Sequence, residues 1–311
     1  MKLLSFEQPL QLLYIELEEK KMKNEDTTNL ENRIEKEIKQ MYDNLTSYNI
    51  VEISRHPDRP HTTDYISGMF SSFMELKGDR AFGDDPAIIT GIGQLKNGSI
   101  AGVLGHRKGI NLKENLKYRY GMAEPEGYRK TLRVASLIAY KFHAPIISFL
   151  DTPGASPTMS AEERGQAEAI AKNLREFFAL PVPIVAVVIG EGGSGGALGI
   201  GIADRILMLK YSIYSVISPE GCASILWRDA SKVKEASNAM KLTANDLFDL
   251  GVIDEIIEEP LGGAHRHKEE VIKSVESSVE KNLADLHNLD KNKLLNLRYE
   301  KYSKMGVYNN G

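Results

Sequence analysis

Residues 183–201, PIVAVVIGEGGSGGALGIG, decide the fold, because an apolar run passes directly into a glycine-rich run. Residues 183–189 show no alternation of polar and apolar side chains, which predicts a strand buried on both faces of a sheet. The glycines then predict a turn that opens a helix. A buried strand that leads straight into a helix is typical of the crossover units of an α/β core.

A similar pattern of strands and helices is predicted around this stretch, from about residue 88 onward. Strands are predicted at 88–95 and 100–104, joined at Asn97-Gly98, a strong hairpin signal. Further strands are predicted at 145–150 and 205–209, and helices at 125–142 and 161–178. Strands that alternate with helices predict an α/β fold class.

Both ends of the chain are helical and polar by pattern. Near the N-terminus, Thr28-x-x-Glu31 is a capping-box signal. The apolar positions of the two predicted helices are Leu10, Leu13, Tyr14 and Leu17, then Leu30, Ile34, Ile38, Met41 and Leu45. We expect this seam, too short to stand alone, to pack on its own domain, with a partner helix as the alternative. The segment from Lys268 onward is predicted to be helical.

Composition excludes several classes of protein. The 311 residues carry a formal net charge of −4, which disfavours generic nucleic-acid binding. The single cysteine, Cys222, cannot build a disulfide framework or a multi-cysteine metal site, and we interpret it as a small packing residue. The longest apolar run, 181–189, is far below the roughly 18 residues of a membrane span. Without a signal-like start, we expect a cytoplasmic protein with no membrane partner.

The glycine-rich run is also the best candidate for chemistry. Glycine allows close backbone approach, and a helix start presents unpaired N–H groups at the positive end of a dipole. Such a site suits an anion, or an oxygen that becomes anionic during a reaction. No Gly-Lys-Ser/Thr follows the run, so a P-loop is excluded.

Two generic motifs match the run as weaker alternatives. Gly190-x-Gly192-x-x-Gly195 has the dinucleotide spacing, but Lys210 and Tyr211 stand where an acidic residue is needed. The second motif is a hydrolase nucleophile elbow, made of Gly192-x-Ser194-x-Gly196 with Asp254 and His265 following in order.

A second loop, 151–157, follows the predicted strand that ends at Leu150. Loops at the carboxyl ends of neighbouring parallel strands meet at one edge of the sheet, so we expect the two loops to share a pocket. We interpret Asp151 as a cap of its own turn, with a base or metal ligand as the alternative. His56 and His61, in the proline-rich passage 55–61, are interpreted as part of a structural turn rather than a metal site.

Residues 101–130 are locally basic, with seven lysines and arginines against three glutamates, a difference of +4. Two interpretations stay open. The charges form a solvated helix face, or they form a landing patch for a phosphate-bearing or acidic partner.

Several longer runs together resemble one family. They are Phe6-Glu7-Gln8-Pro9, Gly105-His106-Arg107-Lys108-Gly109, Pro125-Glu126-Gly127-Tyr128-Arg129-Lys130, Asp151-Thr152-Pro153-Gly154-Ala155, Ala161-Glu162-Glu163-Arg164-Gly165-Gln166, the glycine-rich run, Tyr214-Ser215-Val216-Ile217-Ser218-Pro219-Glu220-Gly221 and Gly262-Gly263-Ala264-His265-Arg266. They cover essentially the whole chain in order. The chain resembles the carboxyltransferase alpha subunit of bacterial-type acetyl-CoA carboxylase.

The resemblance implies a crotonase-like fold, a spiral of ββα units, in residues 81–265. It implies helical extensions at 1–80 and 266–311. The implied assembly is an α2β2 heterotetramer whose beta subunit holds acetyl-CoA and a zinc ribbon, with no metal in this chain. The implied reaction moves the carboxyl group from carboxybiotin, on the biotin carboxyl carrier protein loaded by biotin carboxylase, to acetyl-CoA. The product is malonyl-CoA for fatty-acid synthesis.

The resemblance also implies roles for residues. Gly195 and Gly196 supply backbone N–H donors for biotin. Gly192 and Gly193 shape the approach, and Gly154 and Ala155 form the opposing wall. One departure stands beside them, because Ser156-Pro157-Thr158 replaces the family's usual Tyr-Pro-Gly. A lost aromatic wall keeps two alternatives open: a non-catalytic structural partner of the beta subunit, or a carboxyltransferase for another acyl-CoA.

Overall fold

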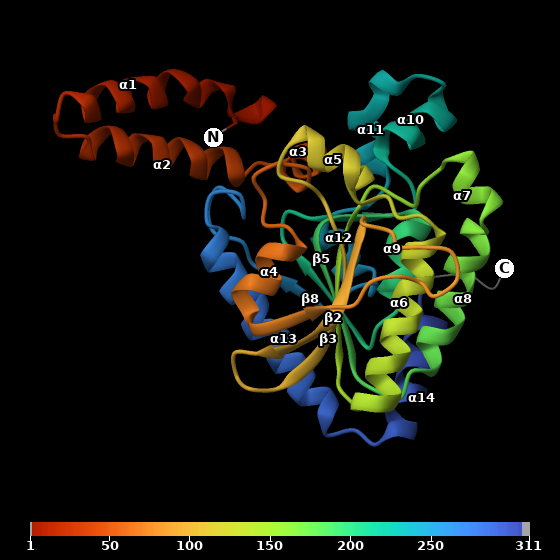
Figure 1. The fold of residues 1–311 in the computed structure, drawn as a ribbon. Coiled ribbons are helices and arrows are strands. Elements are labelled where there is room, and N and C mark those ends of the chain that lie inside the picture. Colours follow the sequence, from red (N-terminus) through yellow and green to blue (C-terminus); the bar gives the residue numbers. More distant parts are fainter. Residues whose placement is uncertain (1, 307–311) are drawn as a thin grey trace.

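The computed structural model describes residues 2–306. Figure 1 shows a central sheet with helices on both faces and a helical hairpin that projects from one side. The strands are β1 (Phe70–Glu75), β2 (Ile88–Leu95), β3 (Ile100–His106), β4 (Ile146–Thr152), β5 (Ile184–Gly193), β6 (Arg205–Leu209), β7 (Ile213–Ser215) and β8 (Glu255–Ile257).

The sheet runs in the order β1-β2-β3-β4-β5-β6-β8. The pairs β1–β2 and β2–β3 are antiparallel, and every pair from β3 to β8 is parallel. Strand β5 changes neighbours along its length, since residues 185–188 pair with β6 and residues 191–193 pair with β7. The hairpin β2–β3 followed by α6 (Pro125–Leu137) is a ββα unit, and the α/β prediction is confirmed.

The central strands are buried on both faces, as the unbroken apolar run predicts. Along β5, Ile184, Ala186 and Val188 belong to one hydrophobic cluster. Val185 and Val187, which point the opposite way, belong to a second cluster. The first cluster is covered by α6 and α8 (Gln166–Ala179), and the second by α4 (Thr62–Met69) and α13 (Lys268–His287).

The remaining helices surround the sheet, and α9 (Ser194–Gly201) lies beside α6 (Figure 1). They are η1 (Ser5–Leu10), α1 (Gln11–Met22), α2 (Thr28–Tyr42), α3 (Ser47–Ser54), α5 (Leu112–Lys117), η2 (Arg119–Gly121), η3 (Ile138–Phe142), α7 (Met159–Glu163), α9 (Ser194–Gly201), α10 (Pro219–Trp227), η4 (Ala230–Lys232), α11 (Val233–Ala239), α12 (Ala244–Asp249) and α14 (Lys291–Ser303). None of the helices within residues 2–306 combines the length and apolarity needed to cross a membrane.

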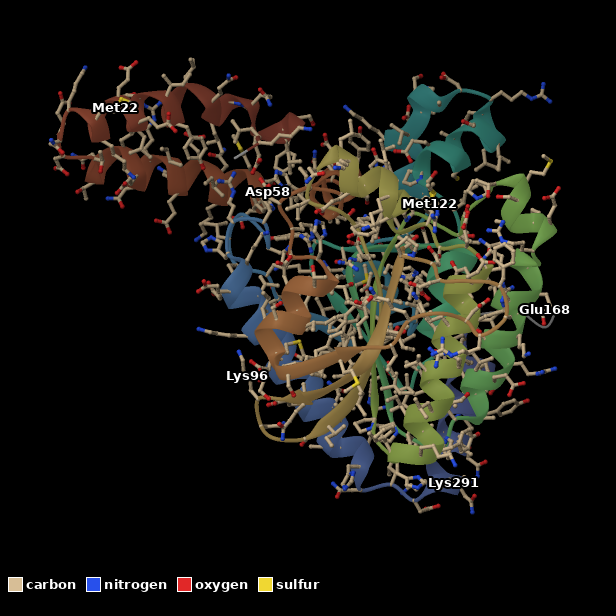
Figure 2. All side chains as sticks on the ribbon, in the orientation of Figure 1. Met22, Asp58, Lys96, Met122, Glu168 and Lys291 are labelled. Carbon is tan, nitrogen blue, oxygen red and sulfur yellow. The ribbon has the colours of Figure 1, made fainter. Side chains whose placement is uncertain are left out.

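The N-terminal seam packs on its own chain, which confirms the first of the two interpretations. Leu30, Ile34 and Ile38 of α2 are buried in a cluster with Leu10 and Tyr211. The far tip of the hairpin stands in solvent, where Met22 is 81% exposed (Figure 2).

The predicted capping box of α2 is wrong. The side chain of Asp26 accepts hydrogen bonds from both the amide and the hydroxyl of Thr28, at 2.9 and 2.6 Å. Thr28 is therefore the first residue of the helix, and the side chain of the N-cap residue Thr27 caps no backbone amide. An aspartate two residues upstream competes with the box for the same groups.

Three predicted elements have different limits in the structure. The helix expected at 161–178 is two helices, because Gly165 has a left-handed φ of 82° between α7 and α8. The helix expected at 125–142 ends in a wide π-type turn, residues 138–142. Strand β5 continues to Gly193, so the first glycines of the run belong to the sheet.

Candidate functional site

The two predicted loops meet backbone to backbone at the carboxyl ends of β4 and β5. A Cβ atom on Gly193 would lie 2.1 Å from the carbonyl oxygen of Pro153, and one on Gly196 would lie 2.3 Å from the carbonyl carbon of Gly154. No side chain fits at these distances, so this contact explains the glycines physically. Gly196 lies against Gly154 and Ala155, whereas Gly193 lies against Pro153 and Thr152.

Free N–H donors converge where the loops meet. Helix α9 begins at Ser194 after its N-cap residue Gly193, and no side chain caps it. The amides of Ser194, Gly195 and Gly196 therefore lack intrahelical acceptors. The nitrogen of Ala155 lies 2.4 Å from the point where a Cβ on Gly196 would sit. Within residues 2–306 its N–H has no acceptor in the chain.

The other two predicted glycines differ from each other. Gly192 pairs with Thr152 through its backbone, but the direction of its missing side chain points at the ring of Tyr214, where an added Cβ would lie 2.7 Å from Cδ2. Gly195 is open, because an added Cβ would meet nothing closer than Ile170 at 3.8 Å. Gly195 therefore lies at a mouth of the site.

An apolar cavity of about 460 Å³ begins beside Gly195. Its wall comes from α8, α9, β6, β7, α12 and α14. The lining residues are Leu174, Phe178, Ser194, Gly195, Leu198, Ile202, Ile206, Tyr214, Ser215, Val216, Leu247, Val252, Tyr302 and Met305. Polar donors at the helix start thus border a hydrophobic hollow.

Two side chains that the sequence analysis missed hold the carbonyl of Gly196. The Nε2 atom of His106 lies 3.2 Å from this oxygen, and the hydroxyl of Tyr128 donates to it at 3.3 Å. The Nδ1 atom of His106 accepts the amide of Asp151 at 3.3 Å, so Nε2 carries the proton. Burial lowers the pKa of His106 to about 4, which keeps the ring neutral.

The prediction that Asp151 caps its own turn is wrong. The turn is held by Thr152, whose hydroxyl accepts the amide of Gly154 at 3.1 Å. Asp151 is buried and forms an ion pair with Lys108, 2.8 Å away, and Lys108 also contacts Glu191 at 2.9 Å. Burial by itself would raise the pKa of Asp151, but Lys108 outweighs it and lowers the pKa. The carboxylate is therefore a structural anion between β4 and β5.

Ser156 is also turned inward. Its side chain is 2% exposed, and its hydroxyl lies 3.2 Å from that of Thr158. Its backbone is tied down as well, because the amide donates to Ala123 and the carbonyl accepts from Gln166. A tyrosine could not enter this position without moving the loop.

The basic stretch 101–130 is neither of the two predicted surfaces. Most of its cations are paired inside the fold. The pairs are Lys108 with Asp151 and Glu191, Arg119 with Asp85, Arg129 with Asp79 and Glu126, and Lys130 with Asp84. Apart from Glu126, the paired carboxylates come from other parts of the sequence and offset the surplus of +4. Lys113 and Lys117, on α5, stay exposed.

The remaining sequence motifs do not assemble a site. The backbone of His56 and Arg59 forms the predicted turn. The ring of His56 stacks on the ring of His265, with ring centroids 4.1 Å apart. His265 is therefore engaged with His56 and not with Ser194. Asp254 accepts the amide of Ile206 instead of orienting a histidine, so the hydrolase triad is not formed. Within residues 2–306 no three His, Cys, Asp or Glu side chains gather as metal ligands.

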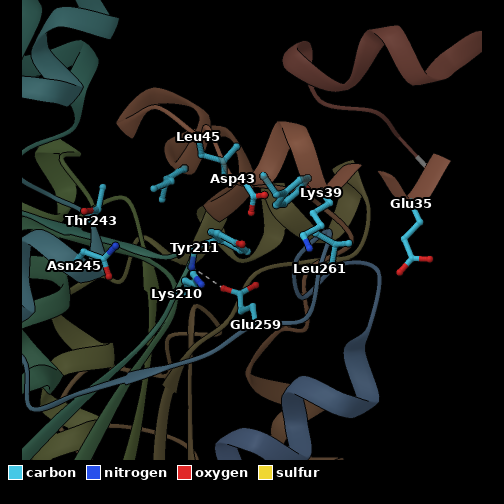
Figure 3. A pocket seen from close by; sticks show the side chains of 12 residues that line it. Glu35, Lys39, Asp43, Leu45, Lys210, Tyr211, Thr243, Asn245, Glu259 and Leu261 are labelled. Atoms are coloured by element: carbon cyan, nitrogen blue, oxygen red, sulfur yellow. Dashed lines mark hydrogen bonds between the residues drawn. The ribbon is translucent and has the colours of Figure 1, made fainter. Parts of the chain in front are cut away.

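A separate hollow of about 640 Å³ lies between α2 and the turn after β6 (Figure 3). Its inner carboxylate, Glu259, already accepts the amide of Tyr211 at 2.9 Å and pairs with Arg59 at 2.9 Å. Lys39 and Asp43 at its rim have opposite charges. None of the glycines of the α9 start lines it, so the candidate site stays at Gly195 and Gly196.

Solved structures with this fold define the class. A Pseudomonas malonate decarboxylase hetero-tetramer in complex with coenzyme A matches with a TM-score of 0.61 at 14% identity, over 77% of this chain and 94% of that chain. A transcarboxylase 12S structure with methylmalonyl-coenzyme A bound has a TM-score of 0.56 at 20% identity, over 71% and 42%. The fold is that of the crotonase-like carboxyltransferases.

Sequence relatives narrow the class to one family. The family model "Acetyl co-enzyme A carboxylase carboxyltransferase-like" matches residues 3–306. The acetyl-coenzyme A carboxylase carboxyl transferase subunit alpha of Methylococcus capsulatus is 50% identical over 99% of this chain and 98% of its own length. That of Geobacter sulfurreducens is 52% identical over 87% and 84%. The chain belongs to the acetyl-CoA carboxylase carboxyltransferase alpha subunit family.

Proposed function

We propose that this chain is the alpha subunit of an acetyl-CoA carboxylase carboxyltransferase, which moves a carboxyl group from carboxybiotin to acetyl-CoA to give malonyl-CoA. The observation that carries the proposal is the convergence of free backbone donors from α9 and from Ala155. Relatives with 50% identity over nearly the whole chain bear the same subunit name. The proposal carries with it the cytoplasmic location and the role in fatty-acid synthesis expected from the sequence.

The residues present fit a biotin head group. Biotin has a polar ureido oxygen and an apolar ring and chain, and the site offers N–H donors beside an apolar cavity of about 460 Å³. When bound, carboxybiotin supplies the carboxyl group and a ureido oxygen on which negative charge develops. The amides of Gly195, Gly196 and Ala155 would stabilise that charge, since donors fixed in advance cost no reorganisation during reaction.

Other residues near the site hold the donors in this geometry. Gly193 and Gly196 let the two loops approach closely, and Asp151 with Lys108 fixes the strands that carry them. No side-chain base is needed at the donors, because the site acts by positioning and by stabilising charge. The open position at Gly195 would admit the substrate.

A partner chain is part of the proposal. Near the site, Val216 is 81% exposed, and on α10 Ile225 and Leu226 are 70% and 65% exposed. Apolar side chains exposed together mark interaction surfaces. We place here the beta subunit of an α2β2 assembly, which would bind acetyl-CoA and carry the zinc. The biotin carboxyl carrier protein and biotin carboxylase complete the proposed set.

The test is malonyl-CoA decarboxylation to acetyl-CoA with free biocytin as acceptor. It compares this chain alone, its beta subunit alone and the mixture. We expect activity only in the mixture, because the donors described here hold one substrate only. A stable complex without activity would instead support a non-catalytic structural partner. Activity with a different acyl-CoA would show that the substrate is not acetyl-CoA.

Gly195→Val is the matching variant. The fold has room for it, since the nearest atom to an added Cβ is 3.8 Å away, but the branched side chain would fill the mouth. We expect a loss of about 100-fold, the scale of a lost oxyanion donor. Gly83→Val is the control, because an added Cβ there meets nothing within 4 Å and Gly83 does not line the cavity beside Gly195. Equal activity of the two variants would contradict the site.

A further inference from the structure

The carbonyl of Gly196 is held from outside its own helix. In a regular helix this oxygen would be satisfied by the amide four residues on. Here it receives two further donors, the ring of His106 at 3.2 Å and the hydroxyl of Tyr128 at 3.3 Å. His106 ends β3 and Tyr128 lies on α6, so two separate elements converge on one peptide of α9.

His106 is itself fixed on its other side. Its Nδ1 atom accepts the amide of Asp151, at the end of β4. The ring is completely buried, and it therefore links the strand that carries the Ala155 loop to the helix that carries Gly195 and Gly196. Because glycine has wide backbone freedom, the start of α9 needs such an external constraint to keep its donors aimed.

We propose that His106 is a positioning residue, which orients the N–H donors of α9 against the Ala155 loop through its bond to the Gly196 carbonyl. This inference rests on the proposed function, since it says how that site is held in register. His106 does not touch the substrate. It acts as a neutral donor of a fixed tautomer, and Tyr128 is the secondary donor to the same oxygen.

The first test uses His106→Leu and His106→Gln in the chain paired with its beta subunit. Leucine has similar bulk but no donor, whereas the glutamine amide can still donate toward Gly196. We expect His106→Leu to lower kcat for malonyl-CoA decarboxylation about 100-fold, as a donor displaced by about 1 Å would, with KM for biocytin nearly unchanged. His106→Gln should recover most of the loss. Equal losses in both variants, or a change confined to KM, would overturn the proposal.

The second test needs no activity. Amide hydrogen exchange of the chain alone should show residues 194–201 exchanging at least about tenfold faster in His106→Leu, the scale of one lost buried hydrogen bond. The strands β4 and β5 should exchange as in the wild type. Unchanged exchange at 194–201 would overturn the positioning role. This result stands even where the wild-type pair shows no transferase activity, so failure of the function and failure of the inference are distinguished.

Tyr128→Phe covers the possibility that His106→Leu does not fold. It keeps the buried ring and removes only the hydroxyl that donates to Gly196. We expect a smaller loss of kcat, about threefold to tenfold, in line with one neutral hydrogen bond. The exposed histidine His287 on α13 is the control, and His287→Leu should match the wild type in both measurements. An effect of His287→Leu equal to that of Tyr128→Phe would also overturn the proposal.

Discussion

Two connections at the same edge of the sheet carry charge in opposite ways: the segment from β3 to α6, and the glycine-rich turn of residues 190–196, where β5 ends and α9 begins. The first is rich in lysine and arginine, and two of its cations, Lys108 and Arg119, form ion pairs inside the fold. The second has one charged residue, Glu191, and presents free backbone donors. The comparison teaches that the formal charge of a segment does not measure its capacity to bind an anion.

Lys108 joins the two connections. It follows the end of β3 and contacts both Asp151, near the end of β4, and Glu191, near the end of β5. Burial by itself would lower the pKa of Lys108, but the two carboxylates outweigh burial and raise it. In the sequence Lys108 looks like a residue that could bind a phosphate. In the structure its charge is instead used to hold Asp151 and Glu191 together.

The largest effect is expected from breaking this link with Lys108→Met. The substitution keeps the length of the side chain but leaves buried carboxylates without their cation. We expect a loss of about 3–5 kcal/mol in the free energy of unfolding, measured by urea denaturation. Lys113→Met, on the exposed helix α5, should cost no more than about 0.5 kcal/mol. Similar losses for both lysines would show that the two connections do not differ in this way.

A smaller effect on the free energy of unfolding is expected from lowering the pH. It distinguishes the contribution of His106 from that of the ion pairs. Burial lowers the pKa of His106 in the folded chain from 6.5 to about 4. The unfolded state therefore binds more protons below pH 6.5. The stability from the neutral ring is fully present above pH 6.5 and is lost as pH falls toward 4. The loss should approach about 3 kcal/mol at pH 4.

The measurement is the free energy of unfolding in urea between pH 7 and pH 4. The wild type should lose stability over this range, and His106→Gln should lose less. Asp151 adds little over this range, because its ordinary pKa of 3.8 and its lowered pKa in the folded chain both lie below the window. His265, whose pKa is lowered to about 2 mainly by burial, adds the same slope to both proteins. Parallel curves for the two proteins would refute the role of His106.

The sequence predicted much of the fold because its signals are local. Residues 183–189 specify a strand buried on both faces, and the hairpin at Asn97-Gly98 specifies β2 and β3. The pairing of the two glycine loops was predicted from the rule that carboxyl ends of parallel strands meet. The resemblance to a family supplied the expected roles of Gly195 and Gly196.

The parts that could not be predicted depend on contacts distant in sequence. His106 and Gly196 are 90 residues apart, and Lys108 and Glu191 are 83 apart. No spacing rule connects such positions, so the basic stretch looked like a surface. The wrong cap at Asp151 has the same origin, because local turn chemistry was outweighed by Lys108, a buried lysine from the segment after β3.

The smallest effect is expected from two neighbouring glycines, and it tests whether the second connection is shaped by close backbone contact. An added Cβ on Gly196 would lie 2.4 Å from the amide nitrogen of Ala155, whereas one on Gly195 would meet nothing within 3.8 Å. Gly196→Ala should therefore force the loops apart and cost about 1–3 kcal/mol in unfolding free energy. Gly195→Ala should be neutral or stabilise by up to about 1 kcal/mol, since alanine favours a helix over glycine. If both alanine variants unfold at the same urea concentration, the loops are not in contact at Gly196, and the donors of α9 and Ala155 do not share one site.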